Sequence, residues 1–141
     1  MRISDLAAGF CHVVALTSAG QVYAWGDNEF RQLGNLTSRD CYGFPVLVAG
    51  NLEGKFVTSI VCGFNHTIVL TDQGEVYGWG YNKHGRIVGD ATKEQSMYIY
   101  DKVIVSPIKI HFPCEENTKI VSVGAGRHFS VALTDKGQVR N

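Results

Sequence analysis

Residues 56–80 read FVTSIVCGFNHTIVLTDQGEVYGWG, and this stretch decides the fold because its pattern occurs three times in the chain. Residues 3–26, ISDLAAGFCHVVALTSAGQVYAWG, repeat the pattern in full, and residues 120–139, IVSVGAGRHFSVALTDKGQV, repeat all but its end. One leucine position recurs at intervals of 54 and 63 residues, at Leu16, Leu70 and Leu133. Periods of this size are typical of repeat architectures, in which one supersecondary unit packs on the next.

Within each unit, short runs rich in β-branched and aromatic residues alternate with turn residues, which predicts strands. The turn after the second run ends in glycine, as in TDQG at residues 71–74, and suits a hairpin closed by a left-handed residue. We expect the turn aspartates, Asp72 and Asp135, to accept backbone N–H bonds. A fourth apolar run follows at residues 45–49 and 103–110, and its prolines suit a sheet edge.

Four short strands in a unit of about fifty residues, without helical periodicity, predict an all-β protein built of four-stranded antiparallel blades, a partial β-propeller. A propeller of the WD type is disfavoured because each tryptophan is followed by glycine. We assign the whole chain, residues 1–141, to this partial propeller. The expected units are repeat one at residues 3–55, repeat two at 56–119 and a truncated repeat three at 120–141.

Composition excludes several classes of function. The formal net charge is zero and no basic run is present, which argues against direct nucleic-acid binding. No apolar stretch is long enough for a transmembrane helix, so no membrane partner is expected. The four cysteines form no Cys-x-x-Cys pair, so we expect neither zinc nor disulfides but buried thiols in an intracellular compartment, cytoplasmic or nuclear. No cofactor motif is found.

The order Gly, His, apolar strand, turn Gly, Val-Tyr-x-Trp-Gly, Asn and then Gln-Leu-Gly resembles the repeat of the regulator of chromosome condensation family. The first unit carries it at Gly9, His12, Leu16, Gly20, Val22, Tyr23, Trp25, Gly26, Asn28, Gln32, Leu33 and Gly34. The second carries it at Gly63, His66, Leu70, Gly74, Val76, Tyr77, Trp79, Gly80, Asn82 and Gly85. Three departures are Arg31 in place of glycine, residues 86–89 in place of Gln-Leu-Gly with one residue extra, and His128 one place early.

The resemblance implies a seven-bladed propeller, of which this chain holds two full units and a strand pair. A blade cannot bury both faces alone, so its neighbours must be supplied. Two explanations stay open: the residues belong to a longer propeller, or another chain, including a second copy, completes the ring.

The recurrent residues have structural interpretations. His12 and His66 lie one blade apart and cannot converge on a metal as zinc ligands do. We expect both to be buried imidazoles hydrogen-bonded to backbone. Trp25 and Trp79 recur before a glycine and are expected in the core between blades. No Ser-His-Asp or Cys-His constellation is present, so no catalytic residues and no enzyme activity are expected.

The polar loops after the tryptophans are the better candidates for function, because loops on a rigid scaffold carry binding residues. Mixed charges beside aromatic residues suit a protein-binding patch, with a solvated rim as the alternative. Residues 96–100, SMYIY, could form an extra edge strand or a contact insertion. The candidate partner-binding rim comprises Asp27, Asn28, Phe30, Arg31, Tyr81, Lys83, His84 and Arg86.

These residues predict a protein-interaction module, part of a larger propeller. The resemblance implies one alternative, guanine-nucleotide exchange on a small GTPase, for the founding type of the family. A second alternative is the recognition segment of a ubiquitin ligase or kinase, since such repeats accompany other domains. Fold alone confers none of these activities.

Overall fold

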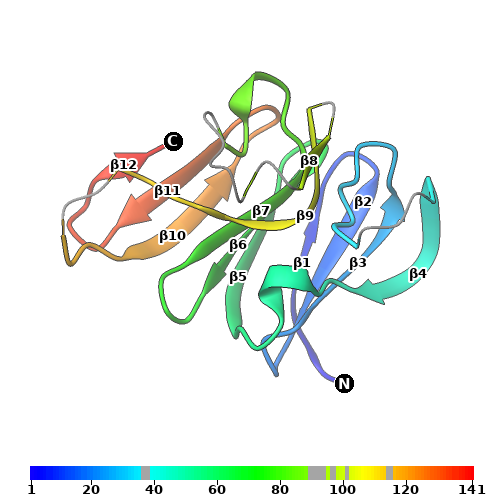
Figure 1. Ribbon diagram of the computed structural model, residues 1–141. Coiled ribbons are helices and arrows are strands. Elements are labelled where there is room, and N and C mark those ends of the chain that lie inside the picture. Colours follow the sequence, from blue (N-terminus) through cyan, green and yellow to red (C-terminus); the bar gives the residue numbers. More distant parts are fainter. Residues whose placement is uncertain (36–38, 89–94, 96–97, 101, 114–115) are drawn as a thin grey trace.

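The computed structural model describes residues 1–35, 39–88, 95, 98–100, 102–113 and 116–141, and these residues form three antiparallel sheets that lie side by side (Figure 1). Blade 1 contains β1 (Ile3–Ala8), β2 (His12–Thr17), β3 (Val22–Asp27) and β4 (Cys41–Leu47). Blade 2 contains β5 (Val57–Cys62), β6 (His66–Thr71), β7 (Val76–Tyr81), β9 (Val103–Ile110) and β8 (Ile99–Tyr100). Blade 3 contains β10 (Ile120–Ala125), β11 (Ser130–Thr134) and β12 (Val139–Arg140).

Strands that follow one another in sequence are neighbours in each sheet, apart from β8, which pairs with the outer side of β9. The first strands of the blades face one another, since β5 contacts both β1 and β10. Two short 3-10 turns, Gly50–Leu52 and Lys83–Gly85, lie in the connections. The all-β partial propeller predicted from the repeat is therefore confirmed.

The outer strands differ in detail from the prediction. β4 begins at Cys41, earlier than expected, and β9 has the expected bounds. Pro45 and Pro107 lie where the register between the third and fourth strands shifts, so they occupy bulges in which no ladder N–H is required. Of the expected edge strand at residues 96–100, Ile99 and Tyr100 form β8, whereas residues 96 and 97 lie outside the described residues.

The hairpin turns have the expected left-handed glycines, with φ of 75°, 73° and 75° at Gly20, Gly74 and Gly137. Asp135 accepts a backbone N–H bond as expected, but its Oδ1 takes the N–H of Lys119 at 3.2 Å, which lies outside the turn. A threonine one residue earlier closes each turn instead. The hydroxyl oxygens of Thr17, Thr71 and Thr134 accept the N–H groups of Gln21, Glu75 and Gln138 at 3.1, 3.2 and 3.0 Å.

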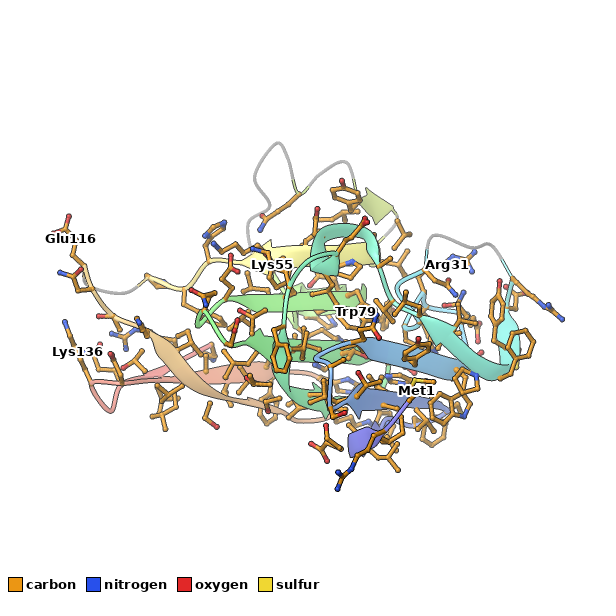
Figure 2. All side chains as sticks on the ribbon, turned by 90° about the horizontal axis from the view of Figure 1, so that it is seen from below. Met1, Arg31, Lys55, Trp79, Glu116 and Lys136 are labelled. Carbon is orange, nitrogen blue, oxygen red and sulfur yellow. The ribbon has the colours of Figure 1, made fainter. Side chains whose placement is uncertain are left out.

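The core between blades 1 and 2 contains Trp79, as its place in the repeat predicts. Figure 2 shows Trp79 in the middle of the molecule. Its side chain is 0% exposed, and its Nε1 donates to the carbonyl of Gln32 in blade 1 at 2.8 Å. Trp25 occupies the equivalent position of blade 1 and is half-buried. The difference arises because blade 1 packs against Trp79, whereas no described blade packs against Trp25.

The repeated histidines are buried, but the expectation of backbone partners is wrong. His12 Nε2 lies 3.0 Å from the hydroxyl of Thr67, and His66 Nε2 lies 3.0 Å from the hydroxyl of Ser130. Each contact joins the second strand of one blade to the second strand of the next. Each junction between described blades therefore contains a buried pair of an imidazole and a hydroxyl beside its apolar side chains.

Candidate partner-binding face

The strand register brings two sets of loops to one face of the molecule. His12 at the start of β2 pairs with Gly26 near the end of β3, and His66 pairs with Gly80 in the same way. The loop before the second strand and the segment after the third strand therefore emerge at the same edge of each blade. We call this edge the loop face, and it carries all the candidate rim residues.

Asn28 and Asn82 organise the segments after β3 and β7. Asn28 Oδ1 accepts the N–H of Leu33 at 3.2 Å, and Asn82 Oδ1 accepts that of Ile87 at 2.9 Å. Asn28 was expected to project from the rim, but its side chain is 0% exposed. The burial has a physical reason, since an amide side chain can satisfy backbone groups on both its oxygen and its nitrogen. Asn28 therefore holds the backbone of the loop in place and does not present a surface to a partner.

In both loops the asparagine bonds to the N–H group five residues later, so the two loops can be aligned residue by residue. Because Leu33 and Ile87 both lie five residues after the asparagine, Arg86 corresponds to Gln32, and no residue is inserted before Ile87. Gln32 donates from Nε2 to Asp27 Oδ2 at 2.9 Å in blade 1. In blade 2 the corresponding residues are Arg86 and Tyr81, and the guanidinium carbon lies 4.6 Å from the ring centroid. The Gln32–Asp27 hydrogen bond of blade 1 is thus replaced in blade 2 by a cation–π contact between Arg86 and Tyr81.

Three of the candidate residues form a stack across blades 1 and 2, which we call the outer row: Phe30, Tyr81 and Arg86. The rings of Phe30 and Tyr81 have centroids 4.4 Å apart, and Arg86 covers Tyr81. Phe30 and Tyr81 are half-buried. The structure thus brings together residues that lie about fifty positions apart in the sequence.

Arg86 is the second candidate that does not project, since it is only 5% exposed. Its Nε donates to the carbonyl of Lys83 at 3.0 Å, and its NH1 is buried with no hydrogen-bond partner among the described residues. Burial lowers the pKa of this guanidinium, and Tyr81 acts in the opposite direction. Lys83 and His84, in contrast, are exposed at the loop face.

Asp27 and Arg31 lie at the blade 1 end of the loop face. Asp27 is half-buried and Arg31 NH1 lies 3.9 Å from the carboxylate of Asp40. Arg31 has φ of 57°, a left-handed conformation, as does Gly85 at the equivalent position of blade 2 with φ of 66°. An arginine therefore stands where the backbone favours glycine. Figure 2 shows Arg31 at the opposite end of the molecule from Lys136.

Sequence reasoning missed a second stack, which we call the inner row: Phe10, Phe64 and Arg127. The rings of Phe10 and Phe64 stack with centroids 4.8 Å apart, and the Arg127 guanidinium carbon lies 4.4 Å from the Phe64 centroid. Each residue directly follows a repeat glycine, Gly9, Gly63 or Gly126, and this shared place in the repeat is the signal that could have identified it.

Backbone bonds hold the inner row in place. The N–H of Phe10 donates to the carbonyl of Phe64 at 2.9 Å, and that of Phe64 to the carbonyl of Arg127 at 3.3 Å. A groove of about 370 Å³ runs along these loops and is lined by all three inner-row residues. Phe10 is 67% exposed, so the row presents aromatic surface at the loop face.

The charges of the loop face differ between the blades. The blade 1 loop carries charges of both signs, Asp27, Glu29 and Asp40 beside Arg31 and Arg39, whereas the described loop residues Lys83, His84, Arg86, Arg127 and His128 of blades 2 and 3 are all basic. Desolvation lowers the pKa of His128, and the charges of Arg86, Arg127 and His84 lower it further. These groups therefore act on one another as a positive cluster.

No group of three or more His, Cys, Asp or Glu side chains among the described residues could hold a metal ion. No described helix is long and apolar enough to span a membrane. Cys11 and Cys41 are exposed free thiols and Cys62 is a half-buried one, so the expectation of buried thiols is wrong for Cys11 and Cys41; Cys114 lies outside the described residues.

Curated relatives share the repeat along almost the whole chain. The Ultraviolet-B receptor UVR8 of Arabidopsis thaliana is 30% identical over 138 residues, which are 98% of this chain and 28% of the relative. The Secretion-regulating guanine nucleotide exchange factor of Bos taurus is 32% identical, and the match covers 98% of this chain and 29% of that relative. The human E3 ubiquitin-protein ligase HERC2 is 35% identical, and the match covers 99% of this chain and 3% of that relative. The chain thus spans well under a third of these relatives.

Solved structures show the same fold. Human WBSCR16 superposes with a TM-score of 0.81 at 21% identity, covering 97% of this chain and 32% of that protein. Yeast RCC1 (Prp20), in its complex with Kap60, has a TM-score of 0.76 at 24% identity, and the match covers 98% of this chain and 31% of that protein. The two matches support the propeller architecture.

Two family models, both described as Regulator of chromosome condensation (RCC1) repeat, match the chain. One covers residues 3–32 and 57–86, and the other covers residues 19–70 and 73–133. Together with the blade architecture and the inter-blade histidine pairs, these matches identify the chain as a member of the RCC1 repeat family.

Proposed function

We propose that the loop face binds another protein, so that the chain serves as the interaction surface of an RCC1-type propeller. One observation carries the proposal: the inner row and the outer row, each an aromatic stack ending in arginine, lie on the same face. Aromatic and arginine side chains are favoured anchors in protein interfaces. Phe10 and Arg127 are exposed and Phe30 and Tyr81 are half-buried, whereas the buried Arg86 supports the Tyr81 ring from beneath the surface.

The relatives support a protein partner without specifying one. A structure of yeast Prp20p, 26% identical to this chain, is described together with that protein's binding properties to Gsp1p and histones. Other relatives are named as a receptor, an exchange factor and a ubiquitin ligase. The shared repeat is thus found in proteins of differing activity, which favours a common role in recognition.

Binding measurements with a purified small GTPase and with purified core histones test the proposal. We expect one of them to bind, and Phe10→Ala with Phe30→Ala to weaken that binding at least tenfold, which is the loss of about 1.4 kcal/mol of anchoring energy. Lys136→Ala, at the opposite end of the molecule, is the control and should bind as the unmodified chain does. Binding unchanged by the phenylalanine substitutions would contradict the proposal.

Guanine-nucleotide exchange is the second candidate function, favoured by the 32% identity to a named exchange factor. Acceleration of nucleotide release from a small GTPase is the measurement, and no acceleration by a full-length propeller would exclude it. A role as the recognition segment of a ubiquitin ligase rests on the likeness to HERC2, of which the chain covers 3%. An intracellular location is proposed on the free thiols of the described residues.

A further inference from the structure

The basic side chains of the loop face in blades 2 and 3 have no acidic partner among the described residues. In blade 1, Arg31 NH1 lies 3.9 Å from the carboxylate of Asp40, so part of the charge of that loop is compensated. The other ion pairs of the described residues join Glu75 to Lys55 and Lys109, at 2.8 and 3.1 Å, and Glu75 lies at the opposite edge of blade 2. The uncompensated basic residues are Lys83, His84, Arg86, Arg127 and His128.

The positive charge is concentrated where blades 2 and 3 meet. Blade 2 has a described blade on each side, so contacts within the described residues set the exposure of its loops, and Lys83 and His84 are exposed there. Desolvation lowers the pKa of His128, and the charges of Arg86 and Arg127 lower it further. An anion in this space therefore meets the field of several cationic groups at once.

Arg127 is held in place with its hydrogen-bond donors free. Its guanidinium carbon lies 4.4 Å from the centroid of the Phe64 ring, and its carbonyl accepts the Phe64 N–H at 3.3 Å. A guanidinium that lies over a ring keeps the N–H groups at its edge available. The side chain is exposed, and no described residue accepts a hydrogen bond from it. Arg127 can therefore form the two parallel hydrogen bonds that a carboxylate prefers.

The groove of about 370 Å³ along the inner row supplies an apolar surface beside this arginine. The stacked rings of Phe10 and Phe64 come from blades 1 and 2, and Arg127 comes from blade 3, so the groove changes from aromatic to cationic along its length. Small residues allow an extended backbone to approach closely, and those that line the groove are Ala8, Gly9, Gly63, Ala125 and Gly126.

We propose that this groove binds an acidic linear segment of the partner protein, in which an Asp or Glu carboxylate binds the edge of Arg127 and a neighbouring apolar side chain packs on Phe10 and Phe64. The role rests on the loop-face function proposed above and specifies the chemistry of the partner. Nucleic acid fits less well, because the chain has no net charge and the blade 1 loop places acidic side chains on the same face.

Selection from a random-peptide display library on the immobilised chain tests the proposal, because it requires no known partner. We expect the selected peptides to be enriched in Asp and Glu beside an aromatic or aliphatic residue. Fluorescence anisotropy of one selected peptide, made synthetically, then gives its affinity for each variant. Arg127→Glu should weaken binding at least tenfold, and Arg127→Lys should weaken it less, because lysine keeps the charge but cannot form two parallel hydrogen bonds.

Charge reversal on both sides provides a sharper test. A peptide in which the critical Asp or Glu is replaced by Arg should bind the Arg127→Glu variant better than it binds the unmodified chain. Lys136→Glu is the matched control, because it makes the same change in net charge in the hairpin turn after β11. It should leave the affinity for the original peptide unchanged to within about twofold. Thermal unfolding verifies that each variant is folded.

Two results would overturn the acidic chemistry and leave the proposed function standing. Selected peptides could show no excess of acidic residues, or acidic peptides could bind the Arg127→Glu variant as well as the unmodified chain, in either case with binding lost in Phe10→Ala. Displacement of the peptide by an oligothymidylate would assign the groove to nucleic acid and also overturn the proposal. A selection that yields no peptide would do the same, whereas the measurements with the small GTPase and core histones would still decide the proposed function.

Discussion

His12 and Thr67 are 55 positions apart in the chain, yet the imidazole Nε2 and the hydroxyl oxygen meet 3.0 Å apart between two blades. His66 and Ser130 repeat this relationship at the next junction. Each pair satisfies one nitrogen of an imidazole that is almost completely buried, whereas Nδ1 of both histidines has no partner among the described residues. Such a ring is accommodated only in its neutral form.

Stability should therefore fall in mild acid. Burial lowers the pKa of both His12 and His66 to about 4, from an ordinary value of 6.5. The unfolded chain binds these protons as the pH falls below 6.5, whereas the folded chain does not bind them until about pH 4. The contribution is thus complete above pH 6.5 and is lost between pH 6.5 and 4, by at most about 3 kcal/mol per histidine.

Urea unfolding at several pH values measures this dependence. His12→Gln removes one of the two titrating groups, so we expect the slope of the unfolding free energy against pH to be reduced in that window. The variant also loses stability at neutral pH, and the slope is therefore the informative quantity. A slope equal to that of the unmodified chain would show that His12 is not the titrating group.

Gly9→Ala and Gly63→Ala should both destabilise the fold. A Cβ at Gly9 would overlap the His12 ring and lie 2.7 Å from the carbonyl oxygen of Gly63, and a Cβ at Gly63 would meet His66 and the carbonyl of Gly126 in the same way. Overpacking of this kind costs about 1–3 kcal/mol or more, because the neighbouring backbone must move. Thermal unfolding is the measurement. Gly43→Ala, with nothing within 4 Å of its Cβ, is the control and should change stability little.

Substitution of the two tryptophans should have unequal effects. Trp79→Phe leaves a cavity between blades 1 and 2 and removes the donor to the Gln32 carbonyl, which together cost about 2 kcal/mol or more. Trp25→Phe affects a half-buried side chain and should cost less. Chemical unfolding of the two variants compares them, and equal losses would contradict the placement of Trp79 in the inter-blade core.

Arg31→Gly should preserve or raise stability. Its φ of 57° is strained for any residue with a Cβ, by about 1–2 kcal/mol, and glycine removes the strain but adds chain entropy to the unfolded state. Arg31→Val, which adds β-branching at the same φ, should instead lower the melting temperature. Thermal unfolding distinguishes the two variants, and a loss of stability with glycine would show that the side-chain contacts of Arg31 outweigh the strain.

Much of the fold could be predicted from local pattern. The strand-forming runs, the left-handed glycines at positions such as Gly74 and the apolar setting of Trp79 all follow from properties that a residue carries wherever it is placed. The bounds of the fourth strand were harder to predict, because the bulge that contains Pro45 depends on pairing with the neighbouring strand rather than on the sequence of the fourth strand.

The rim residues were harder to judge, because exposure depends on neighbours. Asn28 and Arg86 are polar residues in loops, as exposed residues usually are, yet backbone groups and the Tyr81 ring bury them. The inner row was missed because Phe10, Phe64 and Arg127 differ in type, and only their common place after the repeat glycine links them.

By itself the sequence determined the three β units, their turns and their membership of one repeat, because strand alternation and turn chemistry act over a few residues. The tertiary structure alone decided which histidine meets which hydroxyl and which loops share a face. These relationships join residues about fifty positions apart, and the packing angle between blades rather than any local preference brings such residues into contact.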